Sequence, residues 1–155
     1  MKKLLLSSLV VLTALALISP VNAQAQKKIA KGGHVAMPAD DLKWDSLKGA
    51  PPGSGVMSSL LWGNPEKGPF GMFIKFPAGF TMPLHYHSSA FKAVVVKGAY
   101  IYVAENGEEK RLGSGSYFSY PAKDRHATKS AEDSETIFYV EGTGKFDAIP
   151  IEAGK

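Results

Sequence analysis

Residues 79–87 of the chain read GFTMPLHYH, a glycine followed after five residues by two histidines one residue apart. On an extended strand, alternate side chains point to the same face, so His85 and His87 share a face. A third histidine, His126, follows 39 residues after His87 and is expected on a neighbouring strand. Imidazole binds zinc, copper, iron and nickel, and three protein ligands leave coordination positions open. His85, His87 and His126 are therefore predicted to hold one metal ion.

Residues 1–23 have the pattern of a secretory signal peptide. Lys2 and Lys3 precede a run of 15 largely apolar residues, and Pro20 follows the run. Cleavage is expected after Ala23 or Ala25. The run is shorter than the ~20 apolar residues that a membrane-spanning helix needs. We therefore expect a periplasmic or secreted protein with no membrane contact after cleavage; the alternative is an uncleaved N-terminal anchor.

Cleavage after Ala23 would leave 132 residues with a net charge of +2, in place of +4 for the whole chain. This length fits one domain with a hydrophobic core. The weak charge gives no reason to expect a nucleic-acid partner. The chain has no cysteine, so disulfides are excluded and any metal site must use nitrogen and oxygen ligands.

Residues 24–55 are mostly polar and are predicted to form an N-terminal arm, with one short strand at residues 34–37. From residue 56 to residue 155, short runs rich in Val, Ile, Phe and Tyr alternate with Gly, Pro and Asn turns, which is an all-β pattern. The pattern predicts a closed barrel or a double-sheet jelly roll. Nine strands are expected, at residues 57–62, 71–76, 81–87, 91–96, 99–104, 115–120, 126–129, 135–141 and 146–151.

One turn can be predicted in detail. Asn106-Gly107 is a pair that favours positive φ at both central positions of a tight turn. The charged run at residues 105–111 is then the solvated tip of a hairpin.

The spacing of these residues resembles the two motifs of the cupin superfamily. The first motif is a glycine, five residues, His-x-His, three or four residues, a glutamate, six residues and a glycine. The second is a glycine, five residues, a proline, one residue, a glycine, two residues and a histidine, followed after three residues by an asparagine. Seven residues of this chain stand in register with the motifs. Gly79, His85, His87 and Gly98 match the first motif, and Gly115, Pro121 and His126 match the second. Lys123 and Ser130 replace its second glycine and its asparagine. The resemblance implies a cupin-type double-stranded β-helix, a jelly-roll barrel.

The chain departs from the first motif at the glutamate, where it has Phe91. The resemblance therefore carries over three metal ligands and not four, as in three-histidine cupins such as the iron-dependent thiol and diketone dioxygenases. Neutral ligands leave a divalent ion with its full charge, which favours anionic ligands. A site that has lost its metal is the alternative.

The remaining candidates line the expected cavity. Phe91 is interpreted as an apolar wall beside the ion, and Tyr100, Tyr102 and Tyr117 as sources of one phenol donor. Glu141 is a weaker candidate for the missing carboxylate. The sequence pattern indicates no pair of residues that would act as general acid and general base, so it predicts no catalytic residues.

Two functions from different classes fit these residues. The first is a metal-dependent cupin enzyme, dioxygenase-like or isomerase-like, that acts on a small anionic molecule with Fe, Mn, Ni or Zn as its divalent ion. The second is a non-catalytic cupin that binds or senses a small molecule or the metal itself. The resemblance also implies a homodimer, for which the N-terminal arm is the expected point of exchange.

Overall fold

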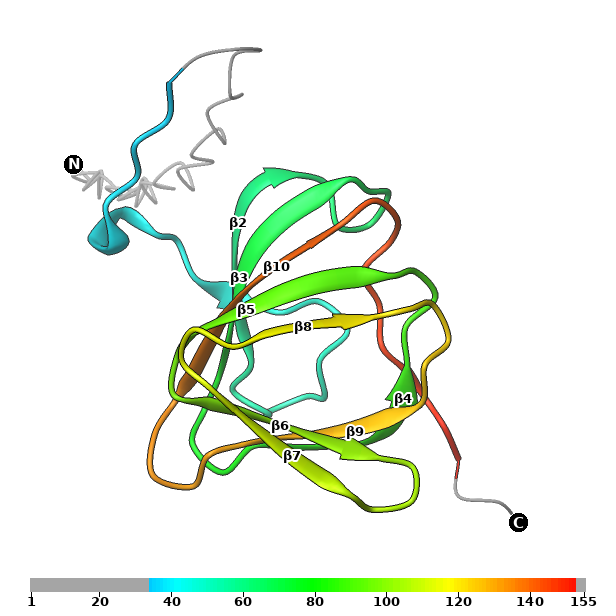
Figure 1. Ribbon diagram of the computed structural model, residues 1–155. Helices are drawn as coiled ribbons and strands as arrows, with labels where there is room; N and C mark the ends of the chain where they lie inside the picture. The colour runs from blue at the N-terminus through cyan, green and yellow to red at the C-terminus, as the bar shows by residue number, and fades with distance from the viewer. Residues whose placement is uncertain (1–33, 153–155) are drawn as a thin grey trace, which may run out of the picture. The chain divides into compact units, whose positions relative to one another are not determined.

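The computed structural model describes residues 34–152, so the predicted signal peptide lies outside the described residues. Two antiparallel sheets face each other (Figure 1), with strand orders β1-β2-β3-β10-β5-β8 and β11-β4-β9-β6-β7. This arrangement confirms the all-β jelly roll. The strands are β1 (Asp45–Ser46), β2 (Met57–Gly63), β3 (Phe70–Phe76), β4 (Thr81–Tyr86), β5 (Phe91–Lys97), β6 (Ala99–Ala104), β7 (Glu109–Gly113), β8 (Tyr117–Tyr120), β9 (His126–Ser130), β10 (Thr136–Gly142) and β11 (Ile149–Pro150).

The core lies between the two sheets because strands such as β5, β8 and β10 alternate inward buried residues with outward, more exposed ones. In β5, Phe91, Ala93 and Val95 are buried, whereas Lys92 and Val94 are exposed. Period-two burial of this kind is what a sheet with one solvated face requires. The interior is strongly aromatic. The rings of Tyr100 and Phe118 stack at 4.4 Å, and further phenylalanines pack around them, including Phe76, Phe80 and Phe138.

Four strand predictions differ from the structure. Of the strand expected at residues 146–151 only β11 (Ile149–Pro150) forms, and β1 was not expected. Residues 34–37 form no strand; they are exposed, and no neighbouring strand pairs with them among the described residues. Residues 109–113 form a strand, β7, where the sequence predicted only a solvated tip. This strand pairs with β6 from Ala99↔Gly113 to Val103↔Glu109. Its charged residues suit the edge of a sheet, where they discourage further pairing.

The second half of the predicted N-terminal arm packs on the barrel. Strand β1 pairs with β2, and Leu47 and Ala50 contact the core. The ammonium group of Lys75 lies 4.3 Å from the centre of the Trp44 ring, a cation–π contact. Among the described residues, no helix is long and apolar enough to cross a membrane.

The hairpin between β6 and β7 is confirmed, but its turn differs from the prediction. Gly107 has φ of 86°, whereas Asn106 is not among the residues with positive φ. The Gly107 N–H donates to the Ala104 carbonyl, and the Ala104 N–H donates to the Glu108 carbonyl. This is a three-residue loop that ends in a left-handed glycine, the second most common type of hairpin connection. The Asn106 side chain accepts a hydrogen bond from the Glu108 N–H, as asparagine side chains in turns commonly do with the backbone two residues on.

Lys123 stands at the motif position usually held by glycine and has φ of 66°. Its N–H donates to the His87 carbonyl at 2.8 Å, so the left-handed conformation holds the loop before β9 against the end of β4. A side chain in this conformation costs ~1–2 kcal/mol. A glycine variant removes this cost, but part of the gain is offset because its unfolded chain has more freedom to lose.

Lys123→Gly should therefore raise the free energy of unfolding by about 0.5–1 kcal/mol. Thermal and urea unfolding measure this directly. Lys123→Ala is the control, since it removes the same charge and keeps the strained backbone. Equal stabilisation by alanine would show that the charge, and not the backbone, sets the stability at this position.

Candidate metal centre

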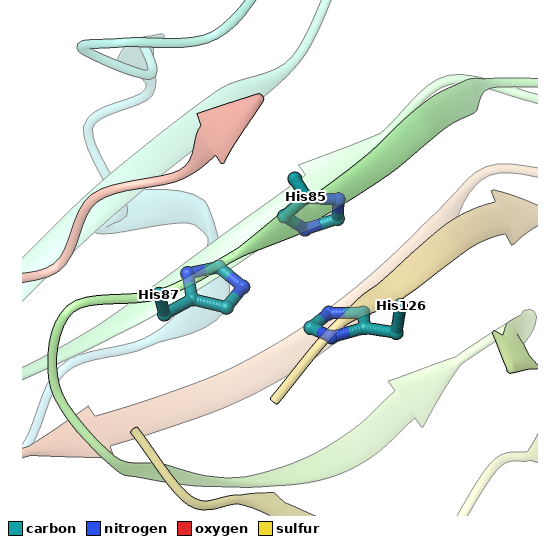
Figure 2. Close-up of side chains that lie close together, drawn as sticks. All are labelled: His85, His87 and His126. Carbon is teal, nitrogen blue, oxygen red and sulfur yellow. The ribbon is translucent and has the colours of Figure 1, made fainter. Parts of the chain in front are cut away.

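The three predicted histidines come together at one end of the barrel. His85 lies near the end of β4, His87 follows that strand, and His126 begins β9. In the antiparallel β4–β9 pair, His85 is directly opposite His126. Figure 2 shows the three rings turned toward a common point between the two strands. The period of two within β4 and the register between strands therefore bring all three imidazoles to one face.

The three side chains are buried, with exposed fractions of 2% for His85, 6% for His87 and 0% for His126. One potential ligand nitrogen from each ring lies within 4.8 Å of the other two. Since a bond from imidazole nitrogen to zinc is ~2.0–2.1 Å long, small movements of the rings would let one ion reach all three. This buried cluster could hold a metal ion.

Backbone carbonyls fix which nitrogen of each ring faces the cluster. The Nδ1–H of His85 donates to the Pro83 carbonyl at 2.8 Å, and that of His126 donates to the Asp124 carbonyl at 3.2 Å. The Nδ1–H of His87 donates to the Asp147 carbonyl. Because a carbonyl oxygen can only accept, each Nδ1 must carry the proton and each Nε2 a lone pair. Hydrogen-bonded second nitrogens of this kind are usual for histidines that bind metals.

His126 Nε2 is the one buried side-chain nitrogen or oxygen without a hydrogen-bond partner in the described part of the chain. A buried polar atom left without a partner costs ~1–3 kcal/mol, so native proteins rarely keep one without a reason. Here the orphaned lone pair points into the cluster, as a ligand of an ion would.

The pKa values of the cluster keep the imidazoles neutral. Burial lowers the pKa of His126 to about 3 and that of His87 to about 4, and the neighbouring histidines add to both shifts. Burial also lowers the pKa of His85. Neutral imidazole is the form that binds metal ions, so the rings are ready for a cation at neutral pH.

The side chain of Asp147 anchors the C-terminal segment that supplies the carbonyl for His87. Its carboxylate accepts the Ser88 N–H at 2.9 Å and the Ser88 hydroxyl at 2.8 Å, and Lys145 lies 3.4 Å away. Strand β11 then pairs with β4, with Ile149 opposite Tyr86. Asp147 therefore helps to set the orientation of the His87 ring, a contribution for which the sequence pattern gave no signal.

Aromatic rings take the place of a fourth ligand. The Phe91 ring packs edge-on against His87 at 4.7 Å, and the Tyr120 ring lies parallel to that of His126 at 4.0 Å. Tyr120, which the sequence did not single out, is buried with its hydroxyl 3.2 Å from that of Tyr100. The Tyr100 hydroxyl is also 2.8 Å from Thr128 Oγ1, and burial raises the pKa of Tyr100 to about 12.

The cavity beside the histidines has a volume of about 50 Å³. Phe91 and Tyr100 line it, as the sequence predicted, together with His85 and His87. The loop at residues 47–51 and the segment at residues 146–148 also line it.

Three other candidates lie elsewhere. Tyr117 is 59% exposed; because the buried Phe118 follows it, strand alternation turns Tyr117 outward. Tyr102 is half-buried and contacts the His126 ring at 6.0 Å, but is not part of the cavity lining. Glu141 lines a separate groove on the other side of Phe91, where it accepts a hydrogen bond from Tyr139 at 3.1 Å. It cannot replace the motif glutamate.

Two solved structures show how widely this fold is shared. The polyketide cyclase RemF from Streptomyces resistomycificus superimposes with a TM-score of 0.64 at 15% identity, over 79% of this chain and 89% of that one. An RmlC-like cupin protein from Ralstonia eutropha gives a TM-score of 0.58 at 25% identity, over 72% of this chain and 69% of that one. The two-sheet barrel and its likeness to such structures make this protein a cupin.

The family can be stated more closely. Residues 19–149 match the family described as "Domain of unknown function (DUF4437)", and the chain belongs to that family. The DNA damage-repair/toleration protein DRT102 of Arabidopsis thaliana is 32% identical over 80 residues, which make up 51% of this chain and 25% of that protein. The match thus spans about a quarter of the length of this relative.

The depressed histidine pKa values predict how stability depends on pH in the absence of metal. Histidine in the unfolded chain titrates near 6.5, whereas the buried rings stay neutral to lower pH. As the pH falls below about 6.5, the unfolded state binds protons first, so the free energy of unfolding falls. Between pH 6.5 and pH 5 the loss should be on the order of 1 kcal/mol each for His87 and His126, whose pKa values are lowered to about 4 and about 3. His85 adds to the loss in the same direction.

Urea unfolding in the presence of a chelator, at half-unit pH steps, measures this dependence. His34, which is exposed, supplies the control, because His34→Gln should leave the slope unchanged while His126→Gln should reduce it. A free energy of unfolding that stays constant between pH 6.5 and pH 5 would contradict the lowered pKa values of the buried histidines.

Proposed function

We propose that this protein is a metal-dependent cupin enzyme that acts on a small anionic molecule, with His85, His87 and His126 as the ligands of one divalent transition metal. The observation that carries the proposal is the convergence of three neutral Nε2 atoms, of which that of His126 is buried without a partner. A set of three imidazoles suits Zn, Fe and Ni, and Mn is the fourth ion proposed.

The chemistry of the proposed centre follows from its ligand set. When bound, the ion would act as a Lewis acid that polarises an oxygen of the substrate, or would bind dioxygen at an open position. Because the three imidazoles are neutral and Phe91 replaces the motif carboxylate, the proposed ligands themselves do not compensate the charge of the ion. An anionic oxygen is therefore the favoured partner.

A non-catalytic binding or sensing protein is the second candidate, and one feature of the cavity favours it. A general acid or base works best with a pKa near the operating pH. Among the described cavity residues, Tyr100 has its pKa raised to about 12, and the Asp147 carboxylate is held by Ser88. Turnover of a substrate, as opposed to binding alone, separates the two candidates. Export of the protein and its assembly into a homodimer are predictions from the sequence alone.

Metal content tests the proposal. Protein purified without a chelating tag should carry close to one metal ion per chain, and the His85→Ala, His87→Ala, His126→Ala triple variant should carry none. Elemental analysis by mass spectrometry gives both values, and circular dichroism shows that the variant is folded. His34→Ala is the matched control. A triple variant that retains its metal would exclude this cluster as the site.

The role of Asp147 gives a second test. Asp147→Ala removes the acceptors of both Ser88 hydrogen bonds and should loosen the carbonyl that orients His87. Changes of this kind typically weaken metal affinity ~10- to 100-fold. Lys145→Ala is the control, because the Lys145 side chain is 59% exposed and its 3.4 Å ion pair with Asp147 should contribute little. Zinc affinities from competition with a coloured chelator decide the matter, and equal affinities for the two variants would show that Asp147 does not position the ligand.

A further inference from the structure

The wall of the cavity beside the candidate metal centre is apolar over most of its surface. Away from the histidines, it is formed by side chains that include Val56, Ile74, Phe76, Phe80, Phe118 and Phe138. All six are buried in the barrel interior, with exposed fractions from 1% to 9%. A ligand whose head lies at the histidines must therefore place the rest of its atoms against hydrocarbon.

The polar groups of the cavity are largely engaged with each other. The Tyr100 hydroxyl forms hydrogen bonds with Thr128 and Tyr120. Lys48 also lines the cavity, but its ammonium donates to Glu66 at 2.6 Å, and both side chains are exposed. Few free donors or acceptors are thus available to a ligand beyond its head.

We propose that the ligand of this cavity is a short molecule with one anionic oxygen head, a carboxylate or an enolate, and an apolar tail, and that polyhydroxylated molecules such as sugar acids are rejected. This inference rests on the proposed metal centre, which would hold the head. The tail lies between Val56 and Phe118. A cavity of about 50 Å³ has room for about three to four water-sized groups, so the tail is short.

Two magnitudes set the expected selectivity. Each methylene group buried against the wall strengthens binding about fourfold. A hydroxyl buried there without a partner weakens binding about 5- to 150-fold. A hydroxyl group that would strengthen the binding of a ligand at a polar site therefore weakens it in this cavity.

The experiment uses the full-length protein loaded with Zn(II), which has no redox chemistry, and titration calorimetry with straight-chain carboxylates from acetate to valerate. Affinity should rise about fourfold for each added methylene until the cavity is filled. Valerate and 4-hydroxybutyrate form a matched pair, since they share the head and differ by a terminal methyl in place of a hydroxyl. Valerate should bind at least fivefold more tightly.

A pair of isosteric variants locates the tail. Val56→Thr places a hydroxyl in the cavity wall and should reduce the valerate preference severalfold, with zinc affinity unchanged. Val96→Thr makes the same change on the outer face, where Val96 is 50% exposed, and should alter nothing. If Val56→Thr does not fold, the comparison of valerate with 4-hydroxybutyrate on the wild-type protein still tests the inference.

The outcomes distinguish this inference from the proposed function. Failure to bind zinc at the histidines overturns the metal centre and this inference with it. Zinc binding together with a flat chain-length series, with equal affinity for valerate and 4-hydroxybutyrate, or with no carboxylate binding, overturns the apolar-tail inference alone. Zinc binding with the expected series and variant effects supports both.

Discussion

Three hydrogen bonds from imidazole Nδ1–H groups to backbone carbonyls are the constraint on which the candidate centre depends. The acceptors belong to separate segments: Pro83 within β4, Asp124 before β9, and Asp147 near the C-terminus. A free imidazole can carry its proton on either nitrogen and can rotate about its side-chain bonds. Fixing both the proton and the ring plane makes three Nε2 lone pairs converge before any ion arrives, so little ordering remains to oppose binding.

The aromatic residues around the cluster explain its electrostatics. Phe91 and Tyr120 pack on His87 and His126, where the superfamily pattern would place a carboxylate at position 91. Their rings exclude water, and burial is the main cause of the lowered pKa values of the histidines. The same exclusion strengthens the field of any bound cation, and none of the three proposed ligands is a carboxylate that would offset its charge. Loss of the glutamate therefore changes the kind of site without leaving a gap in the packing.

The sequence was sufficient for the parts of the structure that follow from local periodicity. The alternation of apolar residues placed most strands of the barrel, and the parity of His85 and His87 placed two ligands on one face. The prediction that Tyr117 lines the cavity failed because it did not use this alternation. Tyr117 and Tyr120 lie three residues apart on β8, so they are on opposite faces: Tyr117 faces solvent and Tyr120 faces the histidines. Asp147 could not have been found, because its link to His87 spans 60 residues and depends on how the chain returns to β4.

The C-terminal segment that pairs with β4 also links the candidate metal centre to the edge of the sheet. Strand β11 adds to the edge of β4, where Pro150 is opposite His85, and the residues just before it hold His87 and line the cavity. The C-terminal segment therefore serves as sheet edge, cavity wall and ligand support together. By linkage, an ion that prefers the oriented His87 must also stabilise the docked segment, and by the same free energy. A change that loosens the C-terminal segment should therefore also lower the affinity for the metal.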